Sequence, residues 1–171
     1  MNKSVIIASV VLSFSFAGLA ESSFPFSPAG AKWTGDNGYR QFDADENWTP
    51  NASGTADELS IQDKKTSFYL ANDVTIVNLK ARGTYSVNSL FGINLDGHVL
   101  NSTGYFKIWN QDIVISNGTW NAASLTMGES AVPRAHLTLD NVTLNLSSSA
   151  LGMGYQSGAT SLTLIDSVLE L

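Results

Sequence analysis

The sequence predicts an all-β fold, specifically a right-handed parallel β-helix, from three features: a repeated segment, a shift in its apolar pattern and the absence of helical periodicity. The segments INLDGHVLNS, IVISNGTWNA, LTLDNVTLNL and LTLIDSVLEL begin at Ile93, Ile113, Leu137 and Leu162. Their starts lie 20, 24 and 25 residues apart. A repeat of this length built from short strands is typical of a solenoid, whose units bury apolar faces by stacking on their neighbours.

The second feature is a shift in the alternation of apolar and polar residues within each segment. In the third segment, Leu139 lies on the apolar side before the Asp140-Asn141 pair. After the pair, Val142 and Leu144 occupy that side. Because strand side chains alternate between two faces, such a shift requires a residue that turns the chain. Asn, Asp and Gly tolerate the left-handed conformation that a corner needs, and one of them stands at this place in all four segments.

The third feature is that no long window carries an apolar stripe with helical spacing. Strand-like segments begin at Ser67, and 74–79 is expected to form a further rung before the four repeats. We therefore assign residues 67–171 to the rungs and 32–66 to an N-terminal capping region. An antiparallel β-sandwich, which also has short strands and frequent turns, is the alternative fold.

The first twenty residues resemble a secretory signal peptide. Lys3 is followed by an apolar run to Phe16, and small residues precede Ala20. This pattern predicts cleavage after Ala20 and export; a retained membrane anchor is the alternative. Residues 21–31, with two prolines, are expected to form an extended leader.

Composition limits the partners. The formal net charge is −6, which disfavours nucleic acid and anionic membranes. The chain has no cysteine, so stability must come from the stacked core rather than from disulfides. No cofactor or metal is expected, and the mature chain is not expected to span a membrane.

Four aromatic residues of the capping region are the candidate binding residues. They could cover the open N-terminal end of the solenoid, which is the favoured interpretation, or form a platform on which sugar rings stack. These residues are Trp33, Tyr39, Phe42 and Trp48. Nearby acidic residues, Asp43, Asp45 and Glu46, followed by Asp57 and Glu58, resemble the start of a calcium loop but lack its glycine and distal glutamate, so we expect a solvated loop.

Candidate catalytic residues are few, and none is assigned. His98 and His136 are expected at the edges of rungs. Asp140 and Asp166 are expected at equivalent corners, where aspartate commonly caps the backbone. The basic residues of the repeats, Lys107 and Arg134, have no evident acidic partner at the same rung position.

Two further residue types are expected to be structural. Trp120 aligns with Leu144 and is expected in the core. Asn117 and Asn141 align with each other and are expected to stack at the corner.

The N-terminal half carries a set of motifs that resembles the passenger repeats of autotransporter-type exported bacterial proteins. The motifs are Trp33-Thr34-Gly35, Phe42 in a position where the family often has Trp, Glu46-Asn47-Trp48, Pro50, 56–61 and 72–79. The resemblance implies an exported surface or secreted β-helix that is structural or adhesive and not an enzyme. Its partners would be polysaccharide or a cell-surface protein. The alternatives are the N-terminal part of a carbohydrate-active β-helix enzyme, either a polysaccharide lyase or a glycoside hydrolase, and a carbohydrate-binding module.

The sequence stops at Leu171, inside a strand pattern. We therefore expect it to be the N-terminal piece of a longer protein. The alternative is a terminal rung that associates end to end with another copy.

Overall fold

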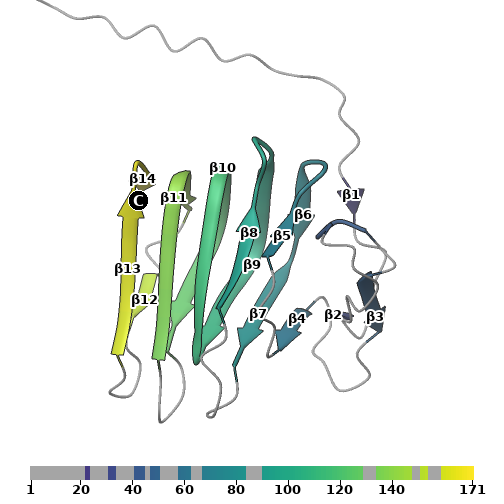
Figure 1. Cartoon of the computed structure of the whole chain (residues 1–171), viewed down its shortest axis with the longest axis horizontal. Coiled ribbons are helices and arrows are strands. Elements are labelled where there is room, and N and C mark those ends of the chain that lie inside the picture. Colours follow the sequence, from purple (N-terminus) through teal and green to yellow (C-terminus); the bar gives the residue numbers. More distant parts are fainter. Residues whose placement is uncertain are drawn as a thin grey trace, which may run out of the picture.

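The repeated segments form strands that pair in parallel with the next repeat, in the register that their sequence similarity predicts. In the computed structural model, β10 (Gln111–Met127) pairs with β11 (Arg134–Leu146) from Gln111 opposite Ala135 to Ala122 opposite Leu146. The chain is a parallel β-helix, as expected, and not an antiparallel β-sandwich (Figure 1). The structure describes residues 22–23, 31–33, 41–44, 47–50, 58–62, 67–83, 90–128, 134–147, 151–153 and 159–171.

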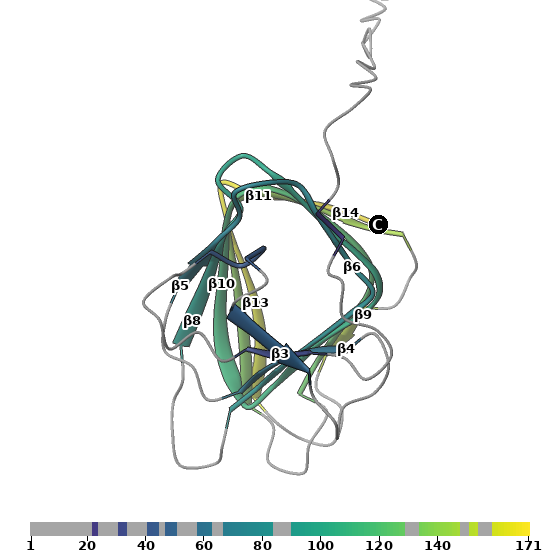
Figure 2. The ribbon, with the colours of Figure 1, turned by 90° about the vertical axis from the view of Figure 1, so that its right-hand side faces the viewer.

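The strands stack into three columns, which we call the first, second and third faces (Figure 2). The first face contains β5 (Ser67–Tyr69), β8 (Leu90–Asn94), the first parts of β10 and β11, and β13 (Ala159–Ile165). The second contains β1 (Ser22–Ser23), β6 (Val74–Ile76), the first part of β9 (Val99–Trp109), later parts of β10 and β11, and β14 (Val168–Glu170). The third contains β2 (Ala31–Trp33), β4 (Glu58–Gln62), β7 (Asn78–Arg82), the ends of β9 and β10, and β12 (Leu151–Met153).

The coil is right-handed and begins before the four clear repeats. Seen from the N-terminal end, the chain passes clockwise from β8 to β9 while it moves away from the viewer (Figure 2). β6 and β7 supply the additional rung expected over 74–79. Among the described strands the only antiparallel pair is β2 with β3 (Trp48–Pro50), at the N-terminal end.

The inward side chains fill the space that the three faces enclose. In β11, buried and partly exposed residues alternate, then Asp140 and Asn141 are both exposed, and the alternation resumes at Val142. This confirms the predicted shift at the corner. Trp120 is fully buried and lies between Leu100 and Leu144 on the neighbouring rungs, which confirms its place in the core.

The corners between the first and second faces use left-handed backbone. Asp96, Asn117, Asn141 and Asp166 have φ values of 51°, 57°, 56° and 46°. Such values are strained for most residues but tolerated by Asn and Asp, because their short side chains bond locally. The Asn, Asp and Gly residues that predicted the corners therefore do form them.

The expected equivalence of Asp140 and Asp166 is wrong by one position. Asp140 pairs with Ile165, and the residue that follows each of them, Asn141 or Asp166, turns the chain. Asp140 is the last residue of its first-face strand. The sequence pattern could not distinguish the two positions, because either member of an Asp-Asn pair tolerates a left-handed conformation.

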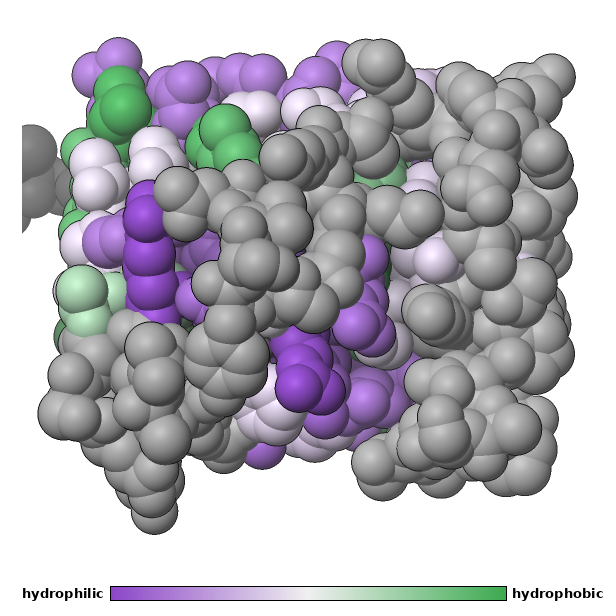
Figure 3. Space-filling view, turned by 60° about the horizontal axis from the view of Figure 1, so that its bottom comes forward, coloured by the Kyte–Doolittle hydropathy of each residue, from purple (hydrophilic) through white to green (hydrophobic). Residues whose placement is uncertain are grey.

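The last described rung leaves apolar side chains accessible. Leu164, Ile165, Val168 and Leu171 are 43%, 46%, 52% and 85% exposed. Apolar residues also gather at this end of the molecule in Figure 3, on the left. End-to-end association through this rung stays a prediction.

Gly118 follows the Asn117 corner, and its Cα faces the preceding rung closely. A Cβ added there would lie 2.6 Å from the His98 carbonyl oxygen and 2.6 Å from Leu95 Cβ. Since these neighbours are backbone and a buried side chain, we expect Gly118→Ala to lower the free energy of unfolding by about 1–3 kcal/mol.

Thermal unfolding followed by circular dichroism measures this effect, with Gly152→Ala as the matched control. The nearest atom to a Cβ at Gly152 lies 3.5 Å away, so this variant should change stability by less than about 0.5 kcal/mol. Equal melting temperatures for the two variants would contradict the close approach at Gly118.

Candidate binding surface

The aromatic residues of the capping region lie inside the molecule, over the first rungs. Trp33, Phe42 and Trp48 are 2%, 0% and 3% exposed. The Trp33 ring centre lies 4.4 Å from that of Phe68 and 5.2 Å from that of Trp48, both in edge-to-face geometry. Phe68 contacts Phe91 on the next rung in the same way, at 5.6 Å. The rings therefore form the cap that the sequence favours.

A sugar ring stacks on an exposed aromatic face, and these three residues offer none. Trp48 meets Trp33 at an interplanar angle of 86° and Phe42 at 82°, so the three rings do not form a flat platform. Trp48 Nε1 also donates to the Phe42 carbonyl at 2.7 Å, which ties the ring inside the cap. Tyr39, the fourth predicted stacking residue, lies outside the described residues.

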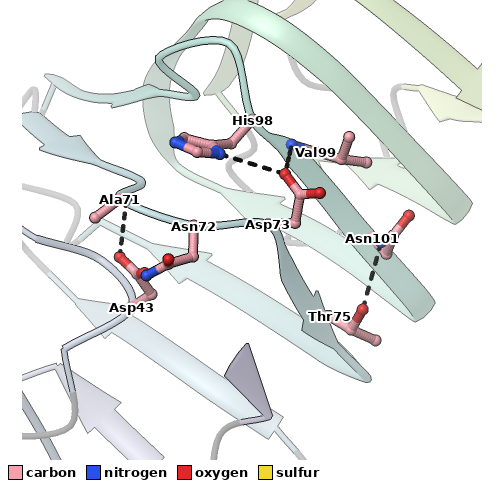
Figure 4. Close-up of polar contacts among 8 residues, drawn as sticks. All are labelled: Asp43, Ala71, Asn72, Asp73, Thr75, His98, Val99 and Asn101. Atoms are coloured by element: carbon pink, nitrogen blue, oxygen red, sulfur yellow. Dashed lines mark hydrogen bonds and ion pairs between the residues drawn. The ribbon is translucent and has the colours of Figure 1, made fainter. Parts of the chain in front are cut away.

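Asp43 closes the cap onto the first complete rung (Figure 4). Its carboxylate accepts hydrogen bonds from the backbone N–H of Ala71 at 3.1 Å and from Asn72 Nδ2 at 2.8 Å. The expected solvated loop is therefore wrong for Asp43, because two donors of the neighbouring rung compensate its burial. Asp45 and Glu46 lie outside the described residues. Among the residues that the structure describes, no group of three His, Cys, Asp or Glu could hold a metal ion.

The two histidines have separate polar partners. His98 lies at a corner with Nδ1 3.3 Å from Asp73 Oδ1, and the same oxygen accepts the Val99 N–H at 2.9 Å (Figure 4). His136 lies near the start of β11 with Nδ1 2.6 Å from Ser161 Oγ on the next rung. The structure therefore places the His–Asp pair and the His–Ser pair at different positions on the coil. Sequence reasoning missed Asp73, which is 25 residues from His98 but adjacent across the rungs.

Arg134 has an acidic partner on the preceding rung, Asp112, which stands opposite His136 rather than at the register position of Arg134. Its guanidinium Nη2 lies 3.0 Å from Asp112 Oδ2, on the preceding rung. The two side chains are 46% and 24% exposed, so solvent screening leaves this pair a small effect on stability. The two residues are 22 positions apart in the sequence and meet because their rungs are aligned. The sequence of one repeat does not reveal this alignment.

Two asparagine ladders run along the helix axis. The corner ladder joins Asn141 Nδ2 to Asn117 Oδ1 at 3.2 Å and Asn117 Nδ2 to Asn94 Oδ1 at 3.0 Å, which confirms the expected stack and extends it by one residue. A second ladder follows the second face, where Asn145 donates to Asn121 at 2.7 Å and Asn121 to Asn101 at 2.8 Å. Asn101 in turn points to Thr75 (Figure 4).

A groove of about 610 Å³ lies beside the second ladder, where the second face turns into the third. It is lined by Asn101, Ser102, Thr103, Asn121, Ala122, Ala123, Asn145, Leu146, Ser147, Glu170 and Leu171. Its lining contains amides, hydroxyls and one carboxylate, and no aromatic ring.

The third face carries a different surface on its outward side, which we call the cationic patch: Lys80, Arg82, Tyr105, Lys107 and Trp109. Lys80 of β7 pairs in register with Lys107 of β9, and Arg82 with Trp109. Lys80 Nζ lies 4.3 Å from the centre of the Trp109 ring, and Arg82 Cζ lies 5.9 Å from it. Lys107 Nζ lies 4.7 Å from the Tyr105 ring centre. These are distances at which a cation is attracted to a ring face.

One buried carboxylate lies beneath this patch. Glu58 is 5% exposed, accepts a hydrogen bond from the Tyr105 hydroxyl, and lies 3.9 Å from Lys80 Nζ. Sequence reasoning identified Lys107 as a basic candidate and expected Glu58 in a solvated loop, which the burial of Glu58 contradicts. The available signal was a cation followed two positions later by a cation or an aromatic residue, Lys80-Ala81-Arg82 and Lys107-Ile108-Trp109, on strands that become neighbours.

Comparison with known proteins finds no matching family, no matching curated protein and no matching solved structure. In the part of the chain that the structure describes, no helix is long and apolar enough to cross a membrane. The fold and its surfaces define the class of molecule: a parallel β-helix with an aromatic N-terminal cap, outward-facing amide ladders and one cationic outer face.

Proposed function

We propose that this protein is an exported bacterial surface or secreted scaffold, which displays binding surfaces on a stiff β-helix and does not turn over a substrate. The observation that carries the proposal is the shared core. Buried apolar residues from Trp33 to Leu146 form one cluster across the described rungs, and the partly buried Leu162 and Leu169 of the last rung pack against it. A solenoid of this kind is stiff because each rung packs against the rung before it and the rung after it. Its outer faces therefore keep fixed positions along the coil and can be displayed to partners.

The polar network supports a structural role for several groups that could otherwise do acid–base chemistry. Asp43 and Asp73 each accept backbone N–H groups of a neighbouring rung. Glu58 is engaged by Tyr105 and Lys80. A glycosidase needs two carboxyl groups on either side of one cleft, and Glu170 is the one acidic residue in the lining of the groove. These observations favour binding over catalysis.

The partners that suit such a scaffold are polysaccharide or cell-surface protein. The outward side chains are short amides and hydroxyls on the second face and cations on the third. Both are suited to ligands rich in hydroxyl and carboxylate groups.

Export is tested by expressing the full chain with a C-terminal epitope tag in a Gram-negative bacterium. We expect the protein outside the cytoplasm, with a mature chain that begins at Glu21 by mass spectrometry. Leu12→Arg is the matched control, because a charge in the apolar run should keep the chain in the cytoplasm. A wild-type chain that remains in the cytoplasm with Met1–Ala20 attached would overturn the proposal.

A further inference from the structure

We propose that the cationic patch binds an acidic polysaccharide, whose carboxylate or sulfate groups pair with Lys80, Arg82 and Lys107. This inference names the ligand class of one displayed surface, and in that sense it rests on the proposed function.

The distribution of charge is the first argument. The chain has a formal net charge of −6, yet three of its nine basic residues meet on one outer face. Lys80 and Lys107 stand directly opposite each other on neighbouring strands, about 4.8 Å apart along the axis. Like charges in this position destabilise a sheet. Glu58 lies 3.9 Å from Lys80 Nζ and offsets part of the repulsion at that residue.

The second argument is that the cations are held in place before a ligand arrives. Trp109 lies against both Lys80 and Arg82, and Tyr105 against Lys107. Tyr105 is itself fixed by its hydrogen bond to Glu58. A long basic side chain that is already ordered loses less conformational entropy on binding, which raises affinity for a ligand that matches the arrangement.

The third argument concerns the groups that flank the cations. Ser60 pairs in register with Lys80 on one side, and Thr126 with Lys107 on the other. Gln62 stands next to Arg82 in the same way. All three have partly exposed positions on the same face. Hydrophilic residues gather along this side of the molecule in Figure 3.

This combination favours a polysaccharide over other polyanions. The row of cations with hydroxyl and amide neighbours matches a polymer that carries one anionic group among several hydroxyls on each sugar. The net negative charge of the rest of the protein repels any polyanion, and it repels nucleic acid, with one charge for about 1.7 Å of duplex, more strongly than a polymer with at most one charge on each sugar.

Titration of the exported protein with alginate, followed by tryptophan fluorescence and by isothermal titration calorimetry at low ionic strength, tests the proposal. We expect alginate to bind and dextran, a neutral glucan, not to bind. The double variant Lys80→Gln/Lys107→Gln should weaken alginate binding at least about tenfold. Arg134→Gln, which removes a basic residue of the first face, should change it by less than about twofold, since it lies outside the patch.

Circular dichroism of each variant shows whether it is folded. We expect the double variant to keep the β-sheet spectrum of the wild type but to melt at a lower temperature, because Lys80→Gln removes the cation beside the buried Glu58 carboxylate. The proposal is overturned if alginate does not bind, if the double variant binds it as tightly as the wild type, or if single-stranded DNA binds as tightly as alginate. If the protein is exported but does not bind alginate, the ligand proposed here is wrong and the scaffold function stands. If the protein binds alginate but is not exported, the proposed exported scaffold is wrong and the ligand assignment stands.

Discussion

Replacing Leu139 with aspartate is expected to unfold the C-terminal rungs. Leu139 is fully buried and lies between Ile115 and Leu164 on the neighbouring rungs. A carboxylate at this place would enter the stacked core without a partner. We expect a loss of about 4 kcal/mol or more, which is comparable to the whole stability of many domains.

The measurement is thermal unfolding by circular dichroism, with Asp140→Asn as the control at the next position along the chain. Asp140 is exposed and ends the first-face strand, so its neutral isostere should shift stability by less than about 0.5 kcal/mol. If Leu139→Asp unfolds with the same midpoint as the wild type, the inward placement of Leu139 is wrong.

The second large effect is expected at the cap, from Phe68→Ala. The Phe68 ring is 1% exposed and contacts Trp33, Phe42 and Phe91. Truncation to alanine would leave a cavity among the Trp33, Phe42 and Phe91 rings. Because these rings also pack against other residues, they cannot move to fill the cavity. We expect a loss of about 3–5 kcal/mol, in the range of large aromatic deletions in protein cores.

Tyr69→Ala is the matched control for the cap, because Tyr69 is the next residue of β5 and points outward with 40% exposure. Chemical denaturation followed by tryptophan fluorescence reports on both variants, since Trp33 and Trp48 lie in the cap. A Phe68→Ala midpoint that equals that of Tyr69→Ala would mean that the cap does not contribute to stability. The protein would then be stabilised by its later rungs alone.

Most of the β-helix could be predicted from the sequence because the same pattern of strands and corners recurs in each repeat. Each rung presents inward apolar residues at corresponding positions, such as Ile93, Ile115 and Leu139. The shift at Asp140-Asn141 reveals a corner without any knowledge of distant contacts. The stack of Asn117 on Asn141 follows from the same alignment, and the structure adds Asn94 below it. Periodic features survive in a single sequence because they depend on the local geometry of strands and turns.

The candidate site depended on features that do not repeat. The sequence identified Trp33, Phe42 and Trp48 as aromatic residues of one region, but either a buried cap or an exposed platform fitted their spacing. Whether a ring is buried depends on what packs over it, and Phe68 and Phe91 come from later rungs. The same reason applies to Asp43, whose donors Ala71 and Asn72 belong to the next part of the coil.

The sequence by itself therefore determined the coil, the corners and the inward residues of the repeats. Only the tertiary structure decided which outward side chains meet. Lys80 and Trp109 lie on neighbouring rungs, more than a full turn of the coil apart along the chain, and loop lengths differ between repeats. Because the register between rungs sets every outward neighbour, the cationic patch exists only once the coil has closed and aligned β7 with β9.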